Sequence, residues 1–533
     1  MELRNKNIKR LESEEFDVVI IGSGINGAVS AAALAARGVK VALIDARDFA
    51  GFTSQHSSNL VWGGIKYMEG YEFGLVAGLC KSRNELLESF PSTVKEIRFL
   101  LTINRQFRFH PLLILASTWL YWLLGRGKTS IPHLLSLQQI KKLEPLVNTY
   151  VSTAGVEYSD AFLHDNDARF VFNFVRSAMD KGCVAANYVA SQGAEQDSNG
   201  HWITRAEDQI SGRQFDIRAR VLINASGAFV DRHNEINGID TEHHHLMSKG
   251  IHLLVPQISQ SHRVLAFFAD DERLFFAIPM ANRTCIGTTD TRVEDPLVSV
   301  TDEDREFVLS NINARLDLSP PLTRKDIIAE RCGVRPLATR KSSDSIDVQQ
   351  LSRKHVIEMD AEKNHISIFG GKLTDCINVG DEISDCVSRL GLHVSPSAGK
   401  WYGEPDRQQR AAYFERAQGL GLDELAAQDT GEVLSERLWR RYGANANAML
   451  DAIENNPALS EPLIDNTGIR RCEIDYLAKH EMIVKLEDYL RRRSKIELLV
   501  SRPVLRQSAG LFEACERLFG NDGKKRFDEY FSQ

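Results

Sequence analysis

The sequence lacks the features that mark several classes of protein. Its eight cysteines include no C-x-x-C pair, so neither a zinc site nor a disulfide framework is expected. Reduced, mostly buried thiols in a cytoplasmic protein are the simpler interpretation. Residues 1–15 are highly charged and contain no apolar core of a signal peptide. Secretion is therefore not expected.

An excess of positive charge and a long apolar run are also missing. Lys+Arg 65 against Asp+Glu 72 gives a net charge of −7, so no overall basic field would recruit nucleic acid, and no such partner is expected. The longest apolar stretch, 111–124, is shorter than the roughly 20 residues that span a bilayer. We interpret it as a buried helix. An interfacial segment is the alternative, because Trp119, Tyr121 and Trp122 suit a lipid–water boundary.

The remaining composition is that of a globular chain, with 43% apolar and 26% charged residues. At about 150 residues per domain, the length predicts three or four domains, or two large ones. Residues 84–99 have helical character, as do residues 170–181. Short strands are predicted at 202–205, 218–224, 251–255, 274–278, 284–288 and 365–369. Past about Trp401 the chain becomes charged, rich in Leu and Ala, and helical, which predicts a separate C-terminal domain.

A dinucleotide-binding pattern opens the chain. Strand 17–21 leads into Gly22-Ser23-Gly24-Ile25-Asn26-Gly27, a helix follows to about Arg37, and a second strand ends at Asp45. Gly22 permits the tight turn, Gly24 lets a pyrophosphate approach the backbone, and Gly27 lets helix and strand pack closely. The helix N-terminus, with Asn26 in its first turn, would face the phosphates, and Asp45 would accept hydrogen bonds from ribose hydroxyls. This favours FAD or NAD over NADP.

Three further segments favour FAD over NAD. A polar stretch contains Thr53, Ser54, Ser57, Ser58, Gly63 and Gly64; a strand ends at Asn224-Ala225-Ser226-Gly227; and Gly370-Gly371-Lys372-Leu373-Thr374 follows another strand. The free N–H groups of that last turn could stabilise negative charge on a reduced flavin. Glycine turns spread from Gly22 to Gly371 suit a flavin held by a discontinuous domain, whereas a compact NAD domain would keep its motifs closer together.

With these segments the chain resembles the FAD-dependent glycerol-3-phosphate dehydrogenases of the D-amino-acid oxidase superfamily. The matching stretches are 17–45, 53–73, 157–160, 165–169, 224–227, 249–252, 286–290, 333–337 and 369–374, with 480–482 and 486–493 in the C-terminal part. The resemblance implies oxidation of sn-glycerol 3-phosphate to dihydroxyacetone phosphate by hydride transfer from C2 to FAD. Electrons would then pass to a membrane quinone or, in oxidase members, to oxygen.

The resemblance also implies roles for individual residues. Arg335 and Lys372 would hold the substrate phosphate, Tyr67 would line the site, and His252 would accept the C2 hydroxyl proton with a pKa near the working pH. The family reads His-Gly-Gly-x-Arg-Tyr where this chain has Trp62-Gly63-Gly64-Ile65-Lys66-Tyr67. Lys66 keeps the positive charge but loses the planar guanidinium. The two departures from the family pattern, Trp62 and Lys66, leave the identity of the substrate open.

The expected fold class is α/β, with a Rossmann-like, discontinuous FAD-binding domain, an α+β substrate domain and a C-terminal helical domain. The FAD-binding domain would comprise 16–85, 156–240 and 331–398, the substrate domain 86–155 and 241–330, and the helical domain 399–533. An amine or amino-acid oxidase on the same scaffold is one alternative function, and a flavin-binding partner protein without turnover is another. The oligomeric state, a homodimer included, is left open.

Several charged or polar groups also have structural interpretations. His252 could be a strand histidine, Arg335 a structural ion pair and Lys372 a solvated lysine. His243-His244-His245 is expected to be a solvated loop rather than a metal site. The basic run 491–495 is expected to be a solvated helix face, or else a contact with anionic lipid. Together with 111–124 this run raises peripheral attachment to the inner face of the cytoplasmic membrane.

Overall fold

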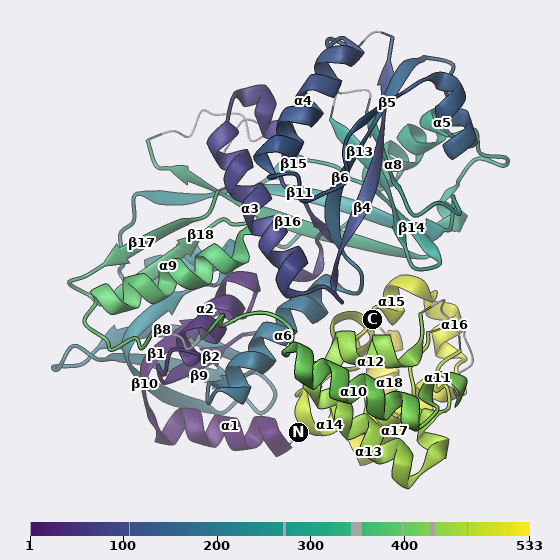
Figure 1. Cartoon of the computed structure of the whole chain (residues 1–533). Coiled ribbons are helices and arrows are strands. Elements are labelled where there is room, and N and C mark those ends of the chain that lie inside the picture. The colour runs from purple at the N-terminus through teal and green to yellow at the C-terminus, as the bar shows by residue number, and fades with distance from the viewer. Residues whose placement is uncertain are drawn as a thin grey trace.

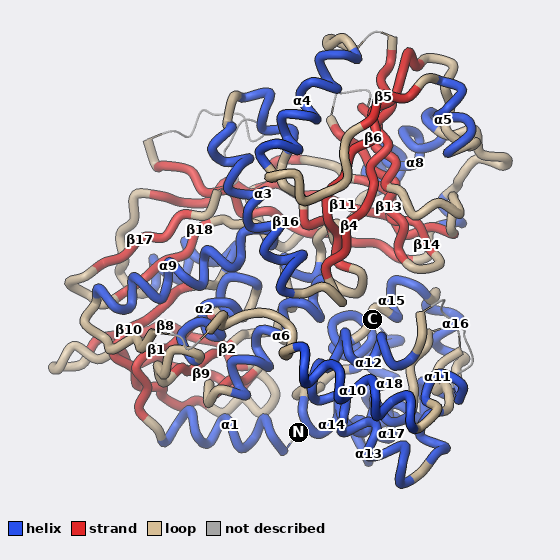
Figure 2. Tube along the Cα trace, in the orientation of Figure 1, coloured by secondary structure: helices blue, strands red, loops and turns tan. Residues whose placement is uncertain are grey.

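The computed structural model describes residues 2–105, 107–269, 273–342, 354–396, 399–425, 432–465 and 467–532. Two sheets and a helical C-terminal region make up the molecule, and the sheets lie one above the other in the view of Figure 1. The strands gather into these two sheets, while the part of the chain past Trp401 is helical (Figure 2). The predicted fold class is confirmed.

The first sheet has the strand order β17-β18-β10-β1-β2-β7, with a β8–β9 hairpin extending it at β10. Its strands are β1 (Glu15–Ile21), β2 (Val41–Ile44), β7 (Val184–Ala186), β8 (Val189–Gln196), β9 (Trp202–Asp208), β10 (Gln214–Asn224), β17 (Val356–Asp360) and β18 (His365–Phe369). β1 pairs in parallel with β2 and β10. Its apolar run is continuous because both faces are buried: Val18 and Ile20 pack on one side, and Val19 and Ile21 on the other.

Helices cover both faces of this sheet. One face carries α2 (Ile25–Ala35), α6 (Asp167–Asp180) and α9 (Cys376–Arg389), with α2 in the middle. The other face is closed by α1 (Glu2–Ser13) and the β8–β9 hairpin. α1 was not predicted, because the charges of the first 15 residues obscure an apolar stripe containing Ile8 and Leu11. Arg4 is buried on its inner side and pairs with Asp208 at 2.6 Å.

The second sheet is largely antiparallel and has the order β15-β11-β14-β13-β12-β4-β6-β3, with β16 on β11 and β5 on β6. Its strands are β3 (Leu60–Val61), β4 (Val94–Asn104), β5 (His133–Leu135), β6 (Ser152–Leu163), β11 (His243–Pro256), β12 (Val264–Phe268), β13 (Leu274–Met280), β14 (Arg283–Gly287), β15 (Thr291–Val293) and β16 (Ala329–Arg340). The helices around it are α3 (Phe73–Ser89), α4 (Pro111–Leu124), α5 (Leu137–Leu143) and α8 (Asp302–Arg315).

This sheet corrects three expectations. The helix predicted over 84–99 ends at Ser89, because the following residues form β4, which pairs with β6 along its length. The domain boundaries predicted at 156 and 331 fall inside β6 and β16, which are continuous strands of the second sheet. The triple histidine is the start of β11 rather than a loop, because it pairs with β16; His245 is buried against Phe369.

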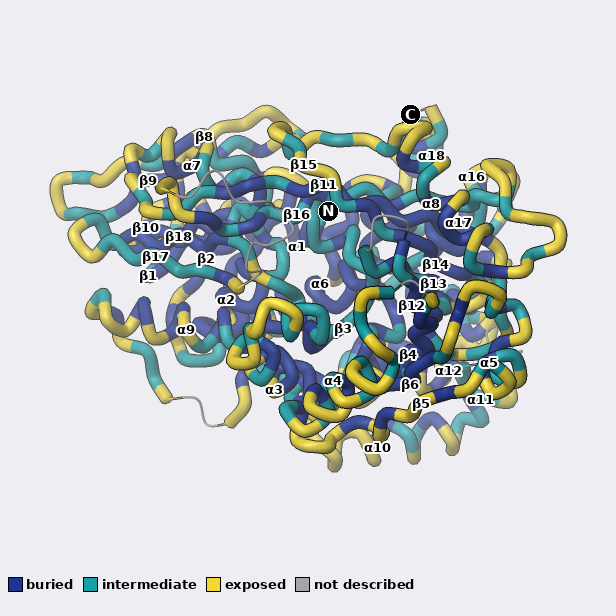
Figure 3. The backbone as a smooth tube through the Cα atoms, turned by 90° about the horizontal axis from the view of Figure 1, so that it is seen from above, coloured by how far each residue is buried: buried dark blue, intermediate teal, exposed yellow. Residues whose placement is uncertain are grey.

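The C-terminal region packs around its own core, which includes Tyr413, Trp439, Ile474 and Leu511. Its helices are α10 (Arg407–Gly419), α11 (Leu422–Leu425), α12 (Leu434–Tyr442), α13 (Asn447–Asn455), α14 (Arg471–His480), α15 (Ile496–Leu499), α16 (Arg502–Arg506), α17 (Ala509–Phe519) and α18 (Gly523–Ser532). In the view of Figure 3 buried residues fill the interior of the molecule, and exposed residues follow its outline.

The basic run of this region is buried, which contradicts both of its predicted roles. Arg491, Arg492 and Arg493 belong to a π-helical turn, Asp488–Arg493, and are at most 4% exposed. Carboxylates of Asp48 and Asp488 pair with Arg492 and Arg493. A solvated face or a lipid contact is therefore excluded for the three arginines, because their side chains are buried inside the protein.

Helix α4 is the opposite case. The interpretation of 111–124 as a buried helix is wrong, because only Thr118 and Tyr121 are buried along it. Its exposed apolar residues are Leu112, Leu113, Trp119, Leu120 and Leu123. Across the described ranges, no helix combines the length and apolarity needed to cross a bilayer.

Candidate functional site: a flavin groove beside a cationic cavity

The glycine turn after β1 is shaped by close backbone packing. Gly22 has φ +96°, and a Cβ there would lie 2.5 Å from the carbonyl oxygen of Ala225. A Cβ on Gly27 would overlap the carbonyl oxygen of Gly22. Gly22 therefore lets the turn pack against the backbone of Ala225 and Ser226, and Gly27 lets the first turn of the helix approach Gly22.

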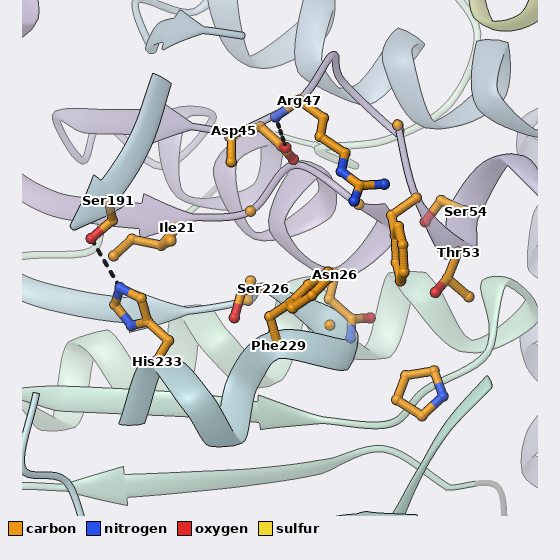
Figure 4. Close-up of a pocket in the computed structure, with 18 of the residues that line it drawn as sticks. Ile21, Asn26, Asp45, Arg47, Thr53, Ser54, Ser191, Ser226, Phe229 and His233 are labelled. Atoms are coloured by element: carbon orange, nitrogen blue, oxygen red, sulfur yellow. Dashed lines mark hydrogen bonds between the residues drawn. The ribbon is translucent and has the colours of Figure 1, made fainter. Parts of the chain in front are cut away.

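Asp45 lies at the end of β2, next to this turn. Its Oδ2 accepts hydrogen bonds from the backbone N and the Oγ of Ser23, both at 2.7 Å, and its Oδ1 accepts one from the backbone N of Arg47 at 2.9 Å. Figure 4 shows the carboxylate on the wall of the groove, across from Ser191 and His233. The carboxylate thus lies beside the glycine turn, and its binding to a ribose stays a prediction of the motif.

The three glycine turns converge on one cavity of about 360 Å³, with Gly24, Gly227 and Gly371 all on its lining. Gly22, Asn26, Asp45 and Ala225 line it too. Asn26 Nδ2 donates to the carbonyl oxygen of Gly370 at 2.9 Å, which joins the first turn to the third. The Oδ1 of Asn26 is buried and accepts no hydrogen bond from the described residues.

A second cavity of about 290 Å³ adjoins the first, and both are lined by Thr53, Ser54, Gly370 and Gly371. Its further lining residues include six that the sequence singled out: Ser57, Ser58, Tyr67, His252, Leu373 and Thr374. Because the two cavities share these lining residues, they form one groove, with Asp45 in the first cavity and cationic residues in the second.

Three cationic residues line the second cavity: Lys354 and the two predicted ones, Arg335 and Lys372. Arg335 extends from β16, where its Nη2 donates to Thr288 Oγ1 at 3.0 Å and its Nη1 lies 3.7 Å from Asp290. Lys372 precedes the short helix Leu373–Asp375, and its Nζ lies 4.0 Å from the ring centre of Tyr67. The ring of Trp62 lies on the same ammonium group, at 5.8 Å.

His252, in β11, lines the same cavity as these cations. It is 3% exposed, and neither ring nitrogen has a hydrogen-bond partner among the residues described. Burial, together with repulsion from Arg331 and Arg335, lowers the pKa of His252 to about 3. The expectation of a pKa near the working pH is therefore wrong for the protein without ligand: the imidazole is neutral and can accept a proton.

Not all of the predicted residues reach the groove. Within the described chain, Gly27, Gly63, Gly64 and Lys66 are outside the lining of both cavities. Gly63 has a different role, because its backbone N donates to Asp160 at 3.2 Å and a Cβ there would collide with the Tyr121 hydroxyl. Close packing behind the site explains this glycine.

Sequence reasoning missed several lining residues. Ser191, Phe229, Arg232 and His233 line the first cavity, and His56 and Thr288 line the second. Two of these residues, Arg232 and His233, lie in α7 (Val230–Ile236). The sequence could have indicated them only because this helix begins just after the predicted turn at Gly227. Ser191, in β8, contacts His233 at 2.9 Å, a pairing that no sequence pattern indicates.

Comparisons with known proteins show that the chain is similar to FAD-dependent enzymes. Residues 17–402 match the model of the FAD dependent oxidoreductase family, and residues 403–526 match the C-terminal domain of alpha-glycerophosphate oxidase. A glycerol-3-phosphate dehydrogenase of Pseudomonas aeruginosa is 31% identical over 497 residues, which cover 92% of this chain and 93% of that one. The chain belongs to the FAD-dependent glycerol-3-phosphate dehydrogenase family.

Other members of the glycerol-3-phosphate dehydrogenase family show the same relationship. Glycerol-3-phosphate dehydrogenase 2 of Mycobacterium tuberculosis is 30% identical over 500 residues, covering 92% of this chain and 82% of that one. The crystal structure of the glycerol-3-phosphate dehydrogenase from Bacillus halodurans complexed with FAD has the same fold, with a TM-score of 0.74 at 23% identity and coverage of 99% and 96%. The present chain is thus an FAD-dependent oxidoreductase.

The groove fits this cofactor. Gly22, Gly24 and Asp45 all line the groove, and a Cβ on Gly24 would lie 3.2 Å from the hydroxyl of Ser54, another lining residue. The buried Oδ1 of Asn26, which has no partner in the part of the chain described, can accept a hydrogen bond from a ligand. A groove that is lined by glycines and carries a carboxylate at one end is the kind of site that binds FAD.

Proposed function

We propose that the protein oxidises sn-glycerol 3-phosphate to dihydroxyacetone phosphate, using FAD. The observation that carries the proposal is the second cavity, which adjoins the cofactor groove and is lined by Arg335, Lys372 and His252. Two cations suit a dianionic phosphate, and a neutral imidazole suits an alcohol proton. The relatives at 30–31% identity are named glycerol-3-phosphate dehydrogenases, which supports the same substrate.

Arg335 and Lys372 would bind the phosphate in different ways. The guanidinium group of Arg335 is oriented by Thr288 and is 27% exposed at the cavity, so it can offer two parallel donors to phosphate oxygens. Lys372 would act as a point charge whose stem and ammonium group are kept in place by the rings of Tyr67 and Trp62. Trp62 would also limit the size of the substrate next to this charge.

His252 would accept the proton of the C2 hydroxyl group as C2 is oxidised. When bound, FAD supplies the acceptor for the hydride that leaves C2. A phosphate dianion nearby would raise the pKa of His252 from its unliganded value of about 3, which makes the imidazole a better base once substrate has bound. Because His252 is buried, water is also kept away from the ring nitrogen that would receive this proton.

For the later steps, we propose a membrane quinone as the electron acceptor and peripheral attachment through α4. The exposed leucines and Trp119 of α4 give a surface that can enter the headgroup region, and Arg126 and Lys128 follow it directly. The burial of the arginines at 491–493 leaves α4 as the support for this attachment.

Replacing Arg335 tests the substrate assignment. Arg335→Ala should raise KM for glycerol 3-phosphate by roughly 10- to 100-fold, because a charged hydrogen bond to phosphate is lost, while Arg335→Lys should recover part of it. FAD absorbance should be unchanged. Arg340→Ala is the matched control, since Arg340 is exposed on the same strand.

Loss of flavin absorbance on addition of substrate measures the proposed oxidation directly. Glycerol 3-phosphate added without oxygen should bleach the bound flavin of the unmodified protein. An absence of bleaching would refute the proposal, and bleaching by an amino acid instead would favour the amine oxidase alternative.

A further inference from the structure

A cluster of buried arginines from the C-terminal region reaches the back of the segment 48–58. This segment supplies Phe52, Thr53 and Ser54 to the first cavity and Thr53 to Ser58, apart from Gln55, to the second. Gln55 instead lies outside the lining of both and is 5% exposed. Contacts that fix Gln55 therefore also restrain the cavity-lining residues on either side of it.

Arg491 and Arg492 hold Gln55 by two different groups. Arg491 donates from Nη2 to the backbone carbonyl oxygen of Gln55, and Arg492 donates from Nη1 to its side-chain Oε1 at 3.1 Å. Gln55 in turn donates from Nε2 to the carbonyl oxygen of Gly51 at 3.1 Å, closing the turn that contains Phe52 to Ser54. The C-terminal region thus contacts both the backbone and the side chain of this one residue.

The beginning of the segment is held by Asp48. Its carboxylate accepts from Arg493 at 2.8 and 2.9 Å and from Arg492 at 2.7 Å. Burial would raise the pKa of Asp48, but the charges of Arg493 and Arg492 outweigh it and keep the pKa below its ordinary value. Asp48 comes three residues after Asp45, which we expect to bind the ribose. These contacts therefore also fix the backbone between Asp45 and the cavity-lining residues Phe52 to Ser54.

The end of the segment is held from the second sheet. Arg331, in β16, donates from Nη1 to the carbonyl oxygen of Ser57 and to Asn59 Oδ1, the latter at 2.8 Å. Ser57 also donates from its backbone N and its Oγ to Asp167, both at 2.9 Å. The segment is therefore clamped at both ends. Between them, Gln55 accepts hydrogen bonds from Arg491 and Arg492, and the ring centre of Phe49 lies 5.9 Å from the guanidinium carbon of Arg493.

The arrangement is costly as a purely structural device. Burying guanidinium groups is unfavourable unless each finds partners, and apolar residues would often stabilise such an interface as well or better. Arg491 lacks a carboxylate partner within hydrogen-bond distance among the described residues, and its Nη1 is buried without a hydrogen bond. Burial, with repulsion from Arg331, lowers its pKa to about 10, so it remains charged at neutral pH.

We propose that Arg491 and Arg492 are positioning residues for FAD: through Gln55 they set the conformation of the segment 48–58 that lines both cavities. The C-terminal region thereby contributes to cofactor binding without touching the cofactor. Because linkage is reciprocal, bound FAD stabilises the docking of the Asp488–Arg493 turn by the same amount. The proposal depends on FAD binding and not on the identity of the substrate.

Arg491→Met tests this assignment in the full-length protein. Titration of FAD into the apoprotein, followed by flavin fluorescence, should show a dissociation constant raised about tenfold, because a charged hydrogen bond that orders the segment is lost. The visible spectrum of the bound flavin should also shift, since Thr53 and Ser54 move relative to it. Arg491→Lys keeps the charge and one donor and should recover part of the affinity. Arg506→Met, which removes an exposed arginine of the same region, should leave both readouts unchanged.

Gln55→Met removes the other contact, which Arg492 makes to Oε1, together with the hydrogen bond from Nε2 to Gly51, and leaves every arginine in place. It should weaken FAD binding in the same direction, which keeps the proposal testable if Arg491→Met fails to fold. The overturning result is a lowered melting temperature in these variants with an unchanged FAD dissociation constant and an unchanged flavin spectrum. The cluster would then serve stability alone.

Discussion

Glycines of this chain differ in what surrounds the position of the missing side chain. At Gly27 the carbonyl oxygen of Gly22 occupies the space that a Cβ would need, whereas a Cβ on Gly74, in α3, would meet nothing within 4 Å. The first glycine is required by packing at the cofactor turn, and the second is merely allowed. Sequence spacing distinguishes them only because Gly27 falls within a recognisable motif.

Gly27→Ala should therefore abolish or greatly weaken FAD binding, because the added methyl group forces α2 away from the turn that faces the phosphates. Gly74→Ala should retain FAD and raise stability slightly, since alanine costs less than glycine in a helix by up to about 1 kcal/mol. Flavin content after purification and melting temperature measure the two effects. Normal flavin content in Gly27→Ala would show that α2 can move without cost.

Chemistry at single residues was less predictable than geometry. The motif places Asp45 correctly beside the groove, because the strand that carries it is short and ends next to the glycine turn. The protonation of His252 depends instead on its burial and on two arginines from β16, which are more than 75 positions away in the sequence. No local pattern reports such neighbours, so its low pKa could not be predicted.

At the scale of elements, composition misjudged two segments in opposite directions. The apolar residues of α4 are exposed, and the three arginines of the Asp488–Arg493 turn are buried. A helix of 14 residues can hide its apolar side only if another element covers it. The buried arginines likewise depend on partners from elsewhere: Asp48 and Asp488 pair with Arg492 and Arg493, and the carbonyl oxygen of Gln55 accepts from Arg491. Both outcomes depend on what lies opposite, which the segment itself does not encode.

The exposed side of α4 leads to a membrane prediction. The double variant Leu120→Glu and Leu123→Glu should lower partition onto phosphatidylglycerol-containing vesicles at least tenfold, because each leucine is worth about 1.5–3 kcal/mol when buried. Co-sedimentation with the vesicles measures this. Val504→Glu, at an exposed apolar residue of the C-terminal region, is the control and should bind as the unmodified protein does. Equal partition of the α4 variant and the control would exclude α4 as the attachment.

Over the whole molecule, buried histidines contribute to the loss of stability in acid. Burial lowers the pKa of His252 and His365 to about 3 and that of His233 to about 4. The unfolded chain binds these protons near pH 6.5, and the folded chain does not. Stability contributed by the neutral histidines is therefore complete above about pH 6.5 and is lost as the pH falls toward 3 or 4.

His365→Asn should make this loss shallower, by up to about 1.4 kcal/mol per pH unit below pH 6.5. His365 is suitable because it is buried in β18, away from the second cavity. Melting temperatures between pH 7.5 and pH 5 measure the slope, and His133→Asn, at an exposed histidine of β5, should leave it unchanged. Parallel slopes for both variants would mean that His365 takes up its proton in the folded state.

The sequence by itself determined the cofactor and the class of fold. The glycine turns, the carboxylate after β2 and the apolar run of β1 each lie within a short segment at a fixed spacing. They can therefore be recognised from the sequence alone. Only the tertiary structure decided which strands belong to which sheet, where the arginines at 491–493 lie, and which side chains meet Arg335 in the second cavity. Those outcomes follow from contacts between residues far apart in the chain, whose energies depend on burial and on the charge that each group finds opposite it.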